Sequence, residues 1–358
     1  MSDALQQDCS LELAATIAEA GAAGRSLYIC GGNSKRQILG RDCTATTLDV
    51  SAHRGITDYQ PSELVLTARG GTPLVDIQTA LAMEGQVLPF EPALFDGQAT
   101  LGGTVACNLS GPARPWAGSV RDLILGVQLI DGSGQLLNFG GKVMKNVAGY
   151  DVSRVQAGAL GTLGVLSEIS LKVLPGYRHS ITLCYETDAT AAIDTMNKRA
   201  GQAAPLSAAC WLDGRLYLRL SGDQQAVDST ARNWGGEQFA EATEFWRNLR
   251  EMKLPFFSGD QPLWRLSVKS TAALCSGAQP TLIDWCGAQR WLRGDFELQA
   301  LQRQAAVAGG NTTLFRGGDR CAAVLPAPDP VSRRLQQRLK QTFDPQGILN
   351  PGRLHAWL

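Results

Sequence analysis

Histidine is scarce in this sequence, which has only three among its 358 residues: His53, His179 and His355. They stand far apart, so no local pair of histidines forms a metal-binding motif. Nine cysteines are present, but no two of them have the CxxC spacing of zinc and iron–sulfur sites. We interpret them as small buried side chains in a reducing compartment. The sequence therefore predicts no bound metal and argues against an iron–sulfur protein.

Net charge and long apolar runs are also missing. Lys plus Arg and Asp plus Glu number 33 each, so no overall field draws the chain to nucleic acid or to anionic lipid. No segment approaches the roughly 20 apolar residues of a membrane-spanning helix. The N-terminus contains acids and lacks the basic start and apolar core of a signal peptide. We expect a cytoplasmic protein, peripheral at the inner face of the cell membrane only through its partners.

Two common phosphate-binding motifs are absent. The loop Gly31-Gly32-Asn33-Ser34-Lys35 does not have the GxGxxG spacing. Gly140-Gly141-Lys142-Val143 lacks the Ser or Thr that follows the lysine of a P-loop. A classical dinucleotide-binding fold and a P-loop nucleotidase are both disfavoured.

The length and the hydrophobic patterns indicate roughly two α+β domains. In the first half we expect, in order, a helix at 10–23 with Ser10 as N-cap, strands at 26–30 and ending near Val50, a helix from Thr72-Pro73 to Gly85, strands at 123–130 and 135–139, and a strand that contains 168–173. The two strands around the turn 131–134 form a hairpin. In the last strand, the alternation of Ile169, Leu171 and Val173 with polar residues predicts burial on one face.

Beyond Pro175 the glycine density falls and a second α+β pattern begins. It has expected strands at 181–185 and 215–220 and a helix from about Thr190. Near the end, Asp329-Pro330 predicts the start of a helix. Its apolar residues recur every four positions, at Val331, Leu335, Leu339 and Phe343.

Glycine is concentrated in three segments of the first half, at 31–35, 100–111 and 158–164. Glycine lets another group approach the main chain closely, and successive N–H groups can form an anion-binding concavity. Each segment alone is also compatible with a tight turn that binds nothing. Three of them in one domain predict a long ligand, with a pyrophosphate at the first and a flat ring near the second.

The order of these motifs resembles one flavoprotein family. The motifs are GGNSK, TLGGTVACNLSGP, GSVRDLILGVQLIDGSG, GGKVMKNVAGYD, GALGTLGVLSEISLKVLP and FDPQGILNPGR, with SGPARPW and LIDWCGAQRWL as further details. The sequence resembles flavoproteins of the vanillyl-alcohol oxidase and p-cresol methylhydroxylase (PCMH) type. Within them it is most similar to the FAD-binding subunits of bacterial glycolate oxidases.

This resemblance implies an α+β fold with three parts. Residues 1–177 would form a PCMH-type FAD-binding domain of two α/β subdomains, and residues 178–325 a smaller α+β cap domain. Residues 326–358 would be a C-terminal helix and tail that pack back on the FAD domain. The first loop has no histidine or cysteine at the matching attachment segment, so the FAD would be bound noncovalently.

The resemblance also implies the residues that hold FAD. Gly31, Gly32, Asn33, Ser34 and Lys35 would hold the pyrophosphate. The pyrophosphate and isoalloxazine would be lined by Gly102, Gly103, Thr104, Ala106 and Ser110. The ribityl and adenine side would be contacted by Gly158, Gly161, Thr162 and the backbone of Val165, while Asn350 returns to the flavin region.

The sequence departs from its dehydrogenating relatives in the cap. Those relatives share a pair of histidines and a further His or Glu there, whereas the segment 178–325 has only His179. No base is evident, so the catalytic residues stay unknown. Arg265 and Arg290 are candidates to clamp a substrate carboxylate, although arginines also serve as structural ion-pair partners. His53 is interpreted as a surface-loop residue.

Four tryptophans enrich the second domain, and they predict either a docking surface for other subunits or that domain's own core. They are Trp246, Trp264, Trp285 and Trp291.

The resemblance implies that the chain works in a complex. Its partners would be a catalytic FAD subunit and an iron–sulfur subunit, and its substrate a small 2-hydroxy acid, glycolate or D-lactate, oxidised to the 2-oxo acid. Electrons would pass to the iron–sulfur subunit. Two hypotheses stay open: the chain is itself an FAD-dependent 2-hydroxy-acid dehydrogenase, or it is a flavin-bearing or structural assembly subunit. The missing histidines favour the second.

Overall fold

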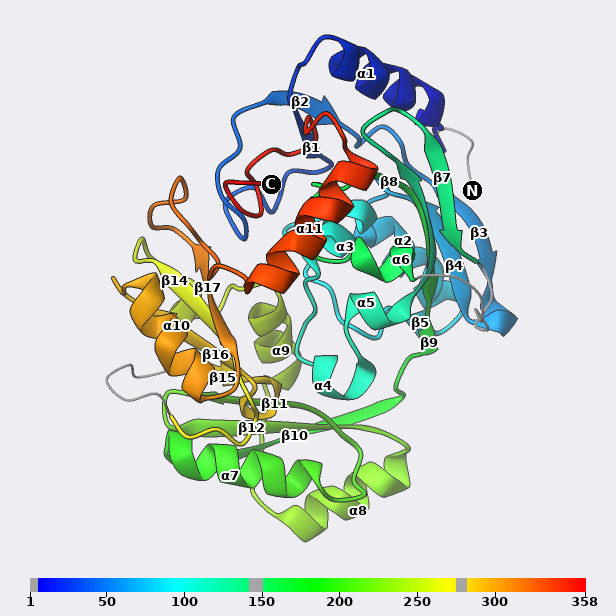
Figure 1. Ribbon diagram of the computed structural model, residues 1–358. Coiled ribbons are helices and arrows are strands. Elements are labelled where there is room, and N and C mark those ends of the chain that lie inside the picture. The colour runs from blue at the N-terminus through cyan, green and yellow to red at the C-terminus, as the bar shows by residue number, and fades with distance from the viewer. Residues whose placement is uncertain (1–5, 142–150, 275–281) are drawn as a thin grey trace.

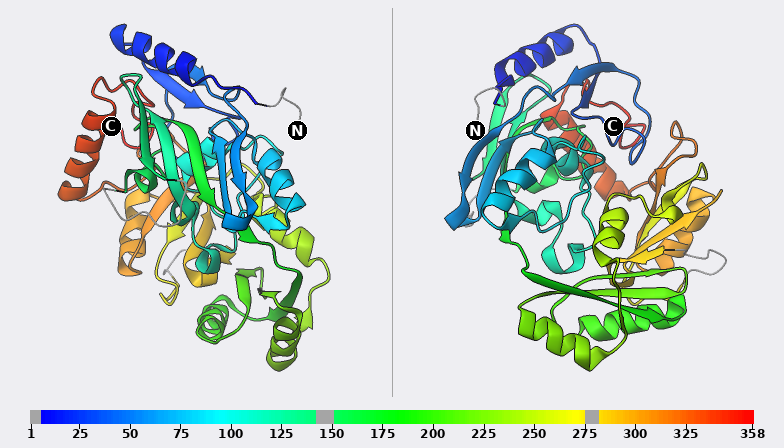
Figure 2. Two further views of the ribbon diagram at one scale, coloured as in Figure 1. Left: turned by 90° about the vertical axis from the view of Figure 1, so that its right-hand side faces the viewer. Right: turned by 180° about the vertical axis from the view of Figure 1, so that it is seen from behind.

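The computed structural model describes residues 6–141, 151–274 and 282–358, and these form two lobes (Figure 1). The motif stretch 142–150 and Cys275 lie outside the described residues. The first lobe holds the N-terminal half and the C-terminal helix and tail, whereas the second holds an eight-stranded sheet. The views in Figure 2 show the same two lobes from the side and from behind.

A five-stranded antiparallel sheet is the centre of the first lobe. Its strand order and bounds are β3 (Ile56–Gln60), β4 (Val65–Arg69), β8 (Val165–Lys172), β6 (Ile124–Ile130) and β7 (Leu136–Gly140). The predicted hairpin is confirmed as β6 and β7. In its turn, the Asp131 carboxylate accepts hydrogen bonds from the main-chain N–H groups of Ser133 and Gln135. Leu123, which we expected in the strand, ends a short helix instead.

Strand β8 lies between β4 and β6, and this position changes its burial. Ile169, Leu171 and Val173 are buried as predicted. Ser170 is buried too, and its hydroxyl lies 2.9 Å from the Thr67 hydroxyl on β4. One-sided burial is therefore a wrong prediction at Ser170, because a central strand with neighbours on both sides can cover its polar face as well.

Helices pack against this sheet around the main apolar core. Their bounds are α2 (Leu74–Met83), α3 (Leu101–Cys107), α5 (Val120–Leu123) and α6 (Val152–Val155). Gly85 follows α2 in the left-handed conformation, as predicted. Thr72 does not cap this helix, contrary to the prediction, because its hydroxyl bonds with the main chain of Gly55 and Pro73 becomes the N-cap.

A second layer of the first lobe contains helix α1 (Ser10–Ala22) and the parallel pair β1 (Leu27–Cys30) and β2 (Thr46–Asp49). The prediction of Ser10 as N-cap is wrong: Ser10 is the first helical residue and Cys9 occupies the cap. The chain's tail returns to this layer. Leu27 donates its N–H to Ile348 O at 2.7 Å and accepts from Asn350 N at 2.8 Å.

An antiparallel eight-stranded sheet forms the second lobe. Its order and bounds are β13 (Glu237–Gln238), β10 (His179–Glu186), β12 (Arg215–Gly222), β11 (Leu206–Leu212), β15 (Leu282–Asp284), β16 (Gln289–Arg293), β14 (Leu263–Ser267) and β17 (Asn311–Arg316). Among the helices of this lobe are α7 (Ala189–Ala200), α8 (Gln224–Trp234), α9 (Ala242–Arg250) and α10 (Leu298–Val307). The expected strands at 181–185 and 215–220 are confirmed as parts of β10 and β12.

The four tryptophans named from the sequence, Trp246, Trp264, Trp285 and Trp291, lie in the interior of this lobe, each 8% exposed or less. Trp246 donates its indole N–H to the Thr182 hydroxyl at 2.9 Å, and Trp264 donates to Gly294 O at 3.0 Å. The docking-surface interpretation of these residues is therefore wrong, and the core interpretation is confirmed.

The two lobes meet along one shared apolar cluster and several polar contacts. The Glu251 carboxylate accepts from the main-chain N–H groups of Leu94 and Phe95, at 2.8 to 3.1 Å. Arg219 pairs with Glu91 at 2.8 Å. These bonds join the segment that precedes α3 to the second lobe. They hold the two lobes on opposite sides of the space between them.

Helix α11 (Pro330–Phe343) lies against the first lobe. Asp329 caps it as predicted, accepting from the N–H groups of Val331 and Ser332. The predicted apolar stripe is buried only at its C-terminal end, where Phe343 packs on Phe139. Val331 and Leu335 are more than half exposed, which the four-residue spacing did not predict.

Candidate functional site

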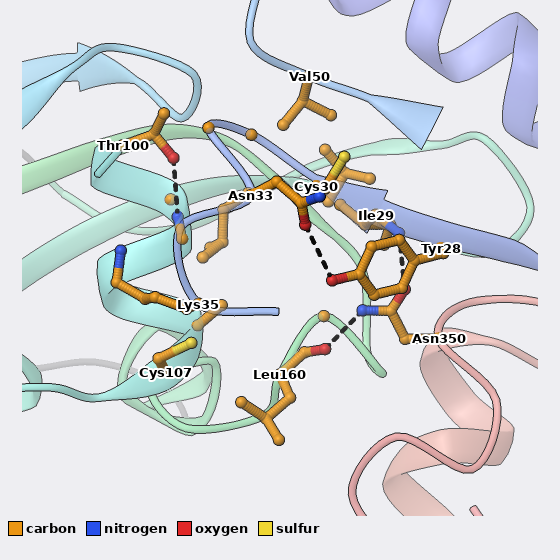
Figure 3. Close-up of a pocket in the computed structure, with 18 of the residues that line it drawn as sticks. Tyr28, Ile29, Cys30, Asn33, Lys35, Val50, Thr100, Cys107, Leu160 and Asn350 are labelled. Atoms are coloured by element: carbon orange, nitrogen blue, oxygen red, sulfur yellow. Dashed lines mark hydrogen bonds between the residues drawn. The ribbon is translucent and has the colours of Figure 1, made fainter. Parts of the chain in front are cut away.

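A cavity of about 820 Å³, counting its open mouth, lies in the first lobe. It is bordered by β1 with the loop at 31–36, the N-terminal part of α3, the turn at 160–166 and the tail at Asn350 and Arg353 (Figure 3). Segments far apart in the chain thus meet around one space. All three glycine-rich segments contribute to its walls.

The first loop packs tightly on the residues before α3. A Cβ atom on Gly32 would lie 1.7 Å from Gln98 O, which leaves no room for any side chain. Asn33 adopts a positive φ of 53°, and its side-chain Oδ1 accepts from the Tyr28 hydroxyl at 3.3 Å. The loop is therefore held in a defined conformation beside the cavity.

Lys35 carries a buried positive charge at this cavity, with 8% of the residue exposed. Its Nζ lies 3.3 Å from the Ser34 hydroxyl and 5.2 Å from the centre of the Phe95 ring. Burial lowers the pKa of Lys35 below its usual value. Within the described part of the chain no carboxylate pairs with it, so an anionic ligand would satisfy this group.

Part of the second glycine-rich segment, 100–111, forms helix α3. Thr100 caps it, accepting from Gly103 N at 3.4 Å. The first N–H groups of the helix already have partners: Leu101 N donates to Thr72 O at 2.9 Å and Gly102 N to Gly70 O at 2.8 Å. Gly102 and Gly103 both line the cavity, so α3 contributes a wall without side chains there, and the partial positive charge of its N-terminal end favours an anion nearby.

The two glycines of α3 differ in what surrounds them. A Cβ on Gly102 would lie 2.9 Å from Gly70 O and close to two further main-chain atoms of that residue. A Cβ on Gly103 would meet only the Thr100 hydroxyl at 3.1 Å and Lys35 Nζ at 4.0 Å. Gly102 therefore serves helix packing, whereas Gly103 keeps space open on the cavity side.

The tail closes the cavity through Asn350, which is 3% exposed. Its side-chain oxygen accepts from Ile29 N at 2.7 Å and its amide donates to Leu160 O at 2.6 Å (Figure 3). A Cβ on Gly161 would lie 2.6 Å from Asn350 Nδ2. The lack of a side chain at Gly161 therefore leaves room for Asn350. Asn350 thus fastens β1 to the turn after α6.

We expect Asn350→Ala to lower the free energy of unfolding by about 2–5 kcal/mol, because it leaves the buried Ile29 N–H and Leu160 carbonyl without partners. Urea unfolding of the flavin-free protein measures this directly. Asn311→Ala, at an exposed strand end, is the matched control and should change stability by less than about 0.5 kcal/mol. Equal stability of the two variants would contradict the role of Asn350 as a fastener.

Gln156 Nε2 and Thr104 Oγ1 are among the buried polar atoms of this lobe that have no hydrogen-bond partner. Gln156 lines the cavity and is 2% exposed. Buried polar groups are normally satisfied, so a donor in the wall without a partner indicates a ligand with an acceptor. Sequence reasoning missed Gln156, which stands just ahead of the third glycine segment.

The other residues predicted at this site take several positions. Ala106 and Val165 line the cavity. Thr104, Gly158 and Thr162 do not border it, and the Thr162 hydroxyl donates to Ala159 O at 2.7 Å.

A second cavity, of about 490 Å³, lies between the lobes. Its first-lobe wall includes Ser110, which we had assigned to the flavin site and whose hydroxyl accepts from Val120 N at 3.2 Å. The opposite wall is one face of β14, β15 and β16. In the register of these strands Arg265 lies opposite Trp291, and Gln289 lies opposite Asp284. Because side chains alternate across a strand, these four share a face.

The charges of this second cavity are unusual. Arg265 lies among side chains that exclude most water, and the resulting loss of hydration lowers its pKa to about 10. Burial raises the pKa of Asp284 to about 8, so this carboxyl is largely protonated at neutral pH. The sequence analysis identified no catalytic acid or base in the second lobe. The feature that could have indicated one is the aspartate at the end of the apolar strand Leu282-Ile283-Asp284.

Arg290 lies on the other face of the same sheet. Its guanidinium donates to the main-chain carbonyls of Gly287, Ala272 and Ala273. The structure therefore places only one of the two predicted carboxylate clamps, Arg265, at a cavity. Strand alternation decides this difference between the two arginines.

His53 is buried, with 2% of the residue exposed, and the surface-loop interpretation is wrong. Its Nδ1 accepts from Cys9 N at 3.0 Å, and its Nε2 lies 3.0 Å from the Ser167 hydroxyl. Burial lowers the pKa of His53. It joins the N-terminal segment to β8, away from both cavities. Across the described ranges, no group of three or more His, Cys, Asp and Glu residues could hold a metal ion.

Comparison with known proteins shows what the chain is similar to. A family model described as an FAD binding domain matches residues 8–140. The glycolate oxidase subunit GlcE of Escherichia coli is 49% identical over 332 residues, which cover 93% of each chain. The glycolate oxidase subunit GlcD of Bacillus subtilis is 31% identical over 120 residues, covering 34% of this chain and 25% of that protein.

The fold comparison agrees with the predicted fold class. A solved structure of alkyldihydroxyacetonephosphate synthase superposes with a TM-score of 0.64 at 14% identity, covering 95% of this chain and 74% of that chain. This likeness shows the fold alone, and it confirms the predicted α+β, PCMH-type class.

The first cavity fits the FAD that this domain binds. Three features of its wall suit FAD: the Lys35 ammonium, the Gln156 amide without a partner, and the open space at Gly103. Together they would fit a ligand that carries negative charge in one part and hydrogen-bond acceptors in another. The loop at 31–35 and the start of α3 would hold the pyrophosphate, as the sequence predicted. Gln156 is added to the predicted set.

Proposed function

This chain belongs to the family of FAD-binding glycolate oxidase subunits, and from that premise we propose that it is the FAD-binding subunit of a glycolate oxidase. The observation that carries the proposal is the identity of 49% across 93% of a glycolate oxidase subunit. The cavity of about 820 Å³ lined by the three glycine segments supports it. The reaction is oxidation of glycolate, with D-lactate as an alternative substrate, to the 2-oxo acid.

Residues of this chain have separate roles at the two cavities. FAD, when bound, would supply two-electron redox chemistry. The loop at 31–35 and Lys35 hold the anionic part of the cofactor and compensate its charge. Segment 107–110 borders both spaces, with Cys107 at the first cavity and Leu109 and Ser110 at the second. The lobe contacts made by Glu251 and Glu91 keep the two cavities side by side and limit the entry of water.

We also propose the chain's partners and its place in the cell. The two glycolate oxidase subunits that resemble this chain support a complex in which it joins a second, catalytic FAD subunit. An iron–sulfur subunit takes the electrons. The described residues contain no helix that is long and apolar enough to cross a membrane. We propose a cytoplasmic complex, peripheral at the inner face of the cell membrane through the partner subunits.

We expect the purified chain to be yellow and to release FAD, not FMN, on acid precipitation. Glycolate added anaerobically should leave its flavin absorbance unchanged, because Asp284, the one acid among the described residues that line the second cavity, is largely protonated at neutral pH and so accepts no proton. Co-expression with the catalytic and iron–sulfur subunits should give glycolate-dependent reduction of a dye.

Three results would change this proposal. A colourless chain that ignores FAD would overturn the cofactor assignment. Rapid bleaching of the isolated chain by glycolate would make it a dehydrogenase in its own right. A co-expressed complex that retains full dye reduction when this chain's flavin is removed would reduce the chain to an assembly subunit.

A further inference from the structure

The second cavity is enclosed mainly by apolar side chains from both lobes. Phe95 and Leu109 contribute from the first lobe, and Phe257, Trp291 and Phe315 from the second. Its volume of about 490 Å³ exceeds that of a small organic acid. Such a space, apolar with a few polar groups, is typical of small-molecule sites. The question is which ligand chemistry its polar groups favour.

Arg265 supplies a positive charge for which no described residue provides a carboxylate partner. Its Nε is buried and has no hydrogen-bond partner, and its guanidinium carbon lies 5.4 Å from the centre of the Phe315 ring. The other cation of the cavity, Arg250, donates to Glu251 at 2.8 Å. A buried guanidinium without a partner is costly, so a carboxylate ligand would satisfy it through two parallel hydrogen bonds.

Further polar groups lie on the same face. Trp291, directly opposite Arg265 in the sheet, has an indole Nε1 that is buried without a partner. On β15, Leu282 lies opposite Trp291, and Asp284 follows two residues later. The Asp284 carboxyl accepts one hydrogen bond, from Trp285 N at 2.7 Å. The face therefore offers donors at one end and a carboxyl group at the other.

We propose that the second cavity binds a small monocarboxylate, whose carboxylate lies on Arg265 and the Trp291 indole and whose 2-oxygen lies toward the Asp284 carboxyl. The assignment of that 2-oxygen, as in a 2-hydroxy or 2-oxo acid, rests on the proposed function. The carboxylate recognition rests on the cavity itself.

Protonation of Asp284 makes this arrangement electrostatically possible. The protonated carboxyl donates a hydrogen bond to the 2-oxygen and does not repel the ligand, whereas above a pH of about 8 it ionises. The binding of a carboxylate should then weaken. The other titratable and charged groups that face Asp284 or line this cavity are Glu91, Arg219, Arg265, Arg250, Cys210 and Cys286.

Equilibrium dialysis of the FAD-loaded full-length chain against radiolabelled glycolate tests the proposal. We expect saturable binding at neutral pH and a loss of roughly tenfold or more in Arg265→Met, because a charge-assisted hydrogen bond is removed. Arg265→Lys keeps a charge and should bind with intermediate affinity. The control Arg215→Met, at an exposed position of β12, should bind like the unaltered protein.

The pH dependence tests the Asp284 part separately. Affinity should fall as the pH rises from about 7 to about 9 in the unaltered chain and stay level in Asp284→Asn, which keeps a neutral hydrogen-bonding group. Acetate, which lacks the 2-oxygen, should bind more weakly than glycolate.

Absence of saturable glycolate binding, or equal affinity in Arg265→Met, would overturn the carboxylate site. A fall with pH in Asp284→Asn as steep as in the unaltered chain would overturn the role of Asp284. The proposed function is judged by FAD content and by dye reduction in the complex, neither of which depends on dialysis. The failure of one proposal is therefore distinguishable from the failure of the other.

Discussion

Replacing Gly103 with valine removes FAD while leaving the chain folded. In the structure a Cβ at this position contacts only the Thr100 hydroxyl and the end of Lys35, so the branched side chain extends into the cavity that the ligand occupies. Flavin absorbance per chain after gel filtration should fall to about one tenth or less, because a filled cavity costs far more than the 1.4 kcal/mol that corresponds to a factor of ten. Circular dichroism should show unchanged secondary structure.

Two other glycines provide the controls. Gly102→Val should destabilise the fold itself, because the side chain meets the main chain of Gly70. Gly201→Val, at a helix end where a Cβ has only ordinary contacts, should retain its flavin. Normal flavin content in Gly103→Val would show that this glycine serves the turn into α3 and not the ligand.

Asp284→Asn should stabilise the flavin-free protein at neutral pH. The pKa of Asp284 is raised from 3.8 to about 8 in the folded state. Between these two values the folded chain keeps a proton that the unfolded chain releases, so the free energy of unfolding falls as the pH rises. Asparagine is neutral in both states and retains an acceptor for Trp285 N. We expect a gain of about 4 kcal/mol at pH 7.

Urea unfolding at several pH values between about 5 and 8 measures this effect. The difference between Asp284→Asn and the unaltered chain should widen with pH. Asp213→Asn, in an exposed turn, should give a constant difference near zero. If the two curves for Asp284→Asn and the unaltered chain run parallel, Asp284 is ionised in the folded protein and the cavity is wetter than the structure indicates.

Local patterns predicted the elements well and their ends less well. The hairpin of β6 and β7 was predictable because alternation and the turn Asp131-Gly132-Ser133-Gly134 lie within one short segment. At Ser10 the error is one residue, since Cys9 occupies the cap and the Asp8 carboxylate accepts from Ser10 N at 2.9 Å. The cap at Thr72 was not predictable, because a contact from elsewhere in the fold decided the outcome. The Thr72 hydroxyl bonds to Gly55, and the helix begins after it.

For the cofactor site, contiguous motifs carried most of the information. Flavin-binding loops act through their main chain, so the glycines of 31–35 and 100–107 mark them in the sequence itself. Gln156 was missed because its significance is an amide without a partner, which only a three-dimensional structure shows. The different roles of Gly102 and Gly103 were hidden for the same reason, since both stand in one motif.

The sequence by itself determined that this chain is an α+β flavoprotein subunit without clustered thiolates, and it predicted the FAD site at three glycine segments. Only the tertiary structure shows the second cavity. Its groups come from distant segments that meet only in the folded chain, and strand register places Arg265 inside while Arg290 faces away. The protonation of Asp284 was likewise decided by burial, because the pKa of a carboxyl depends on the water and charges around it and not on its neighbours in sequence.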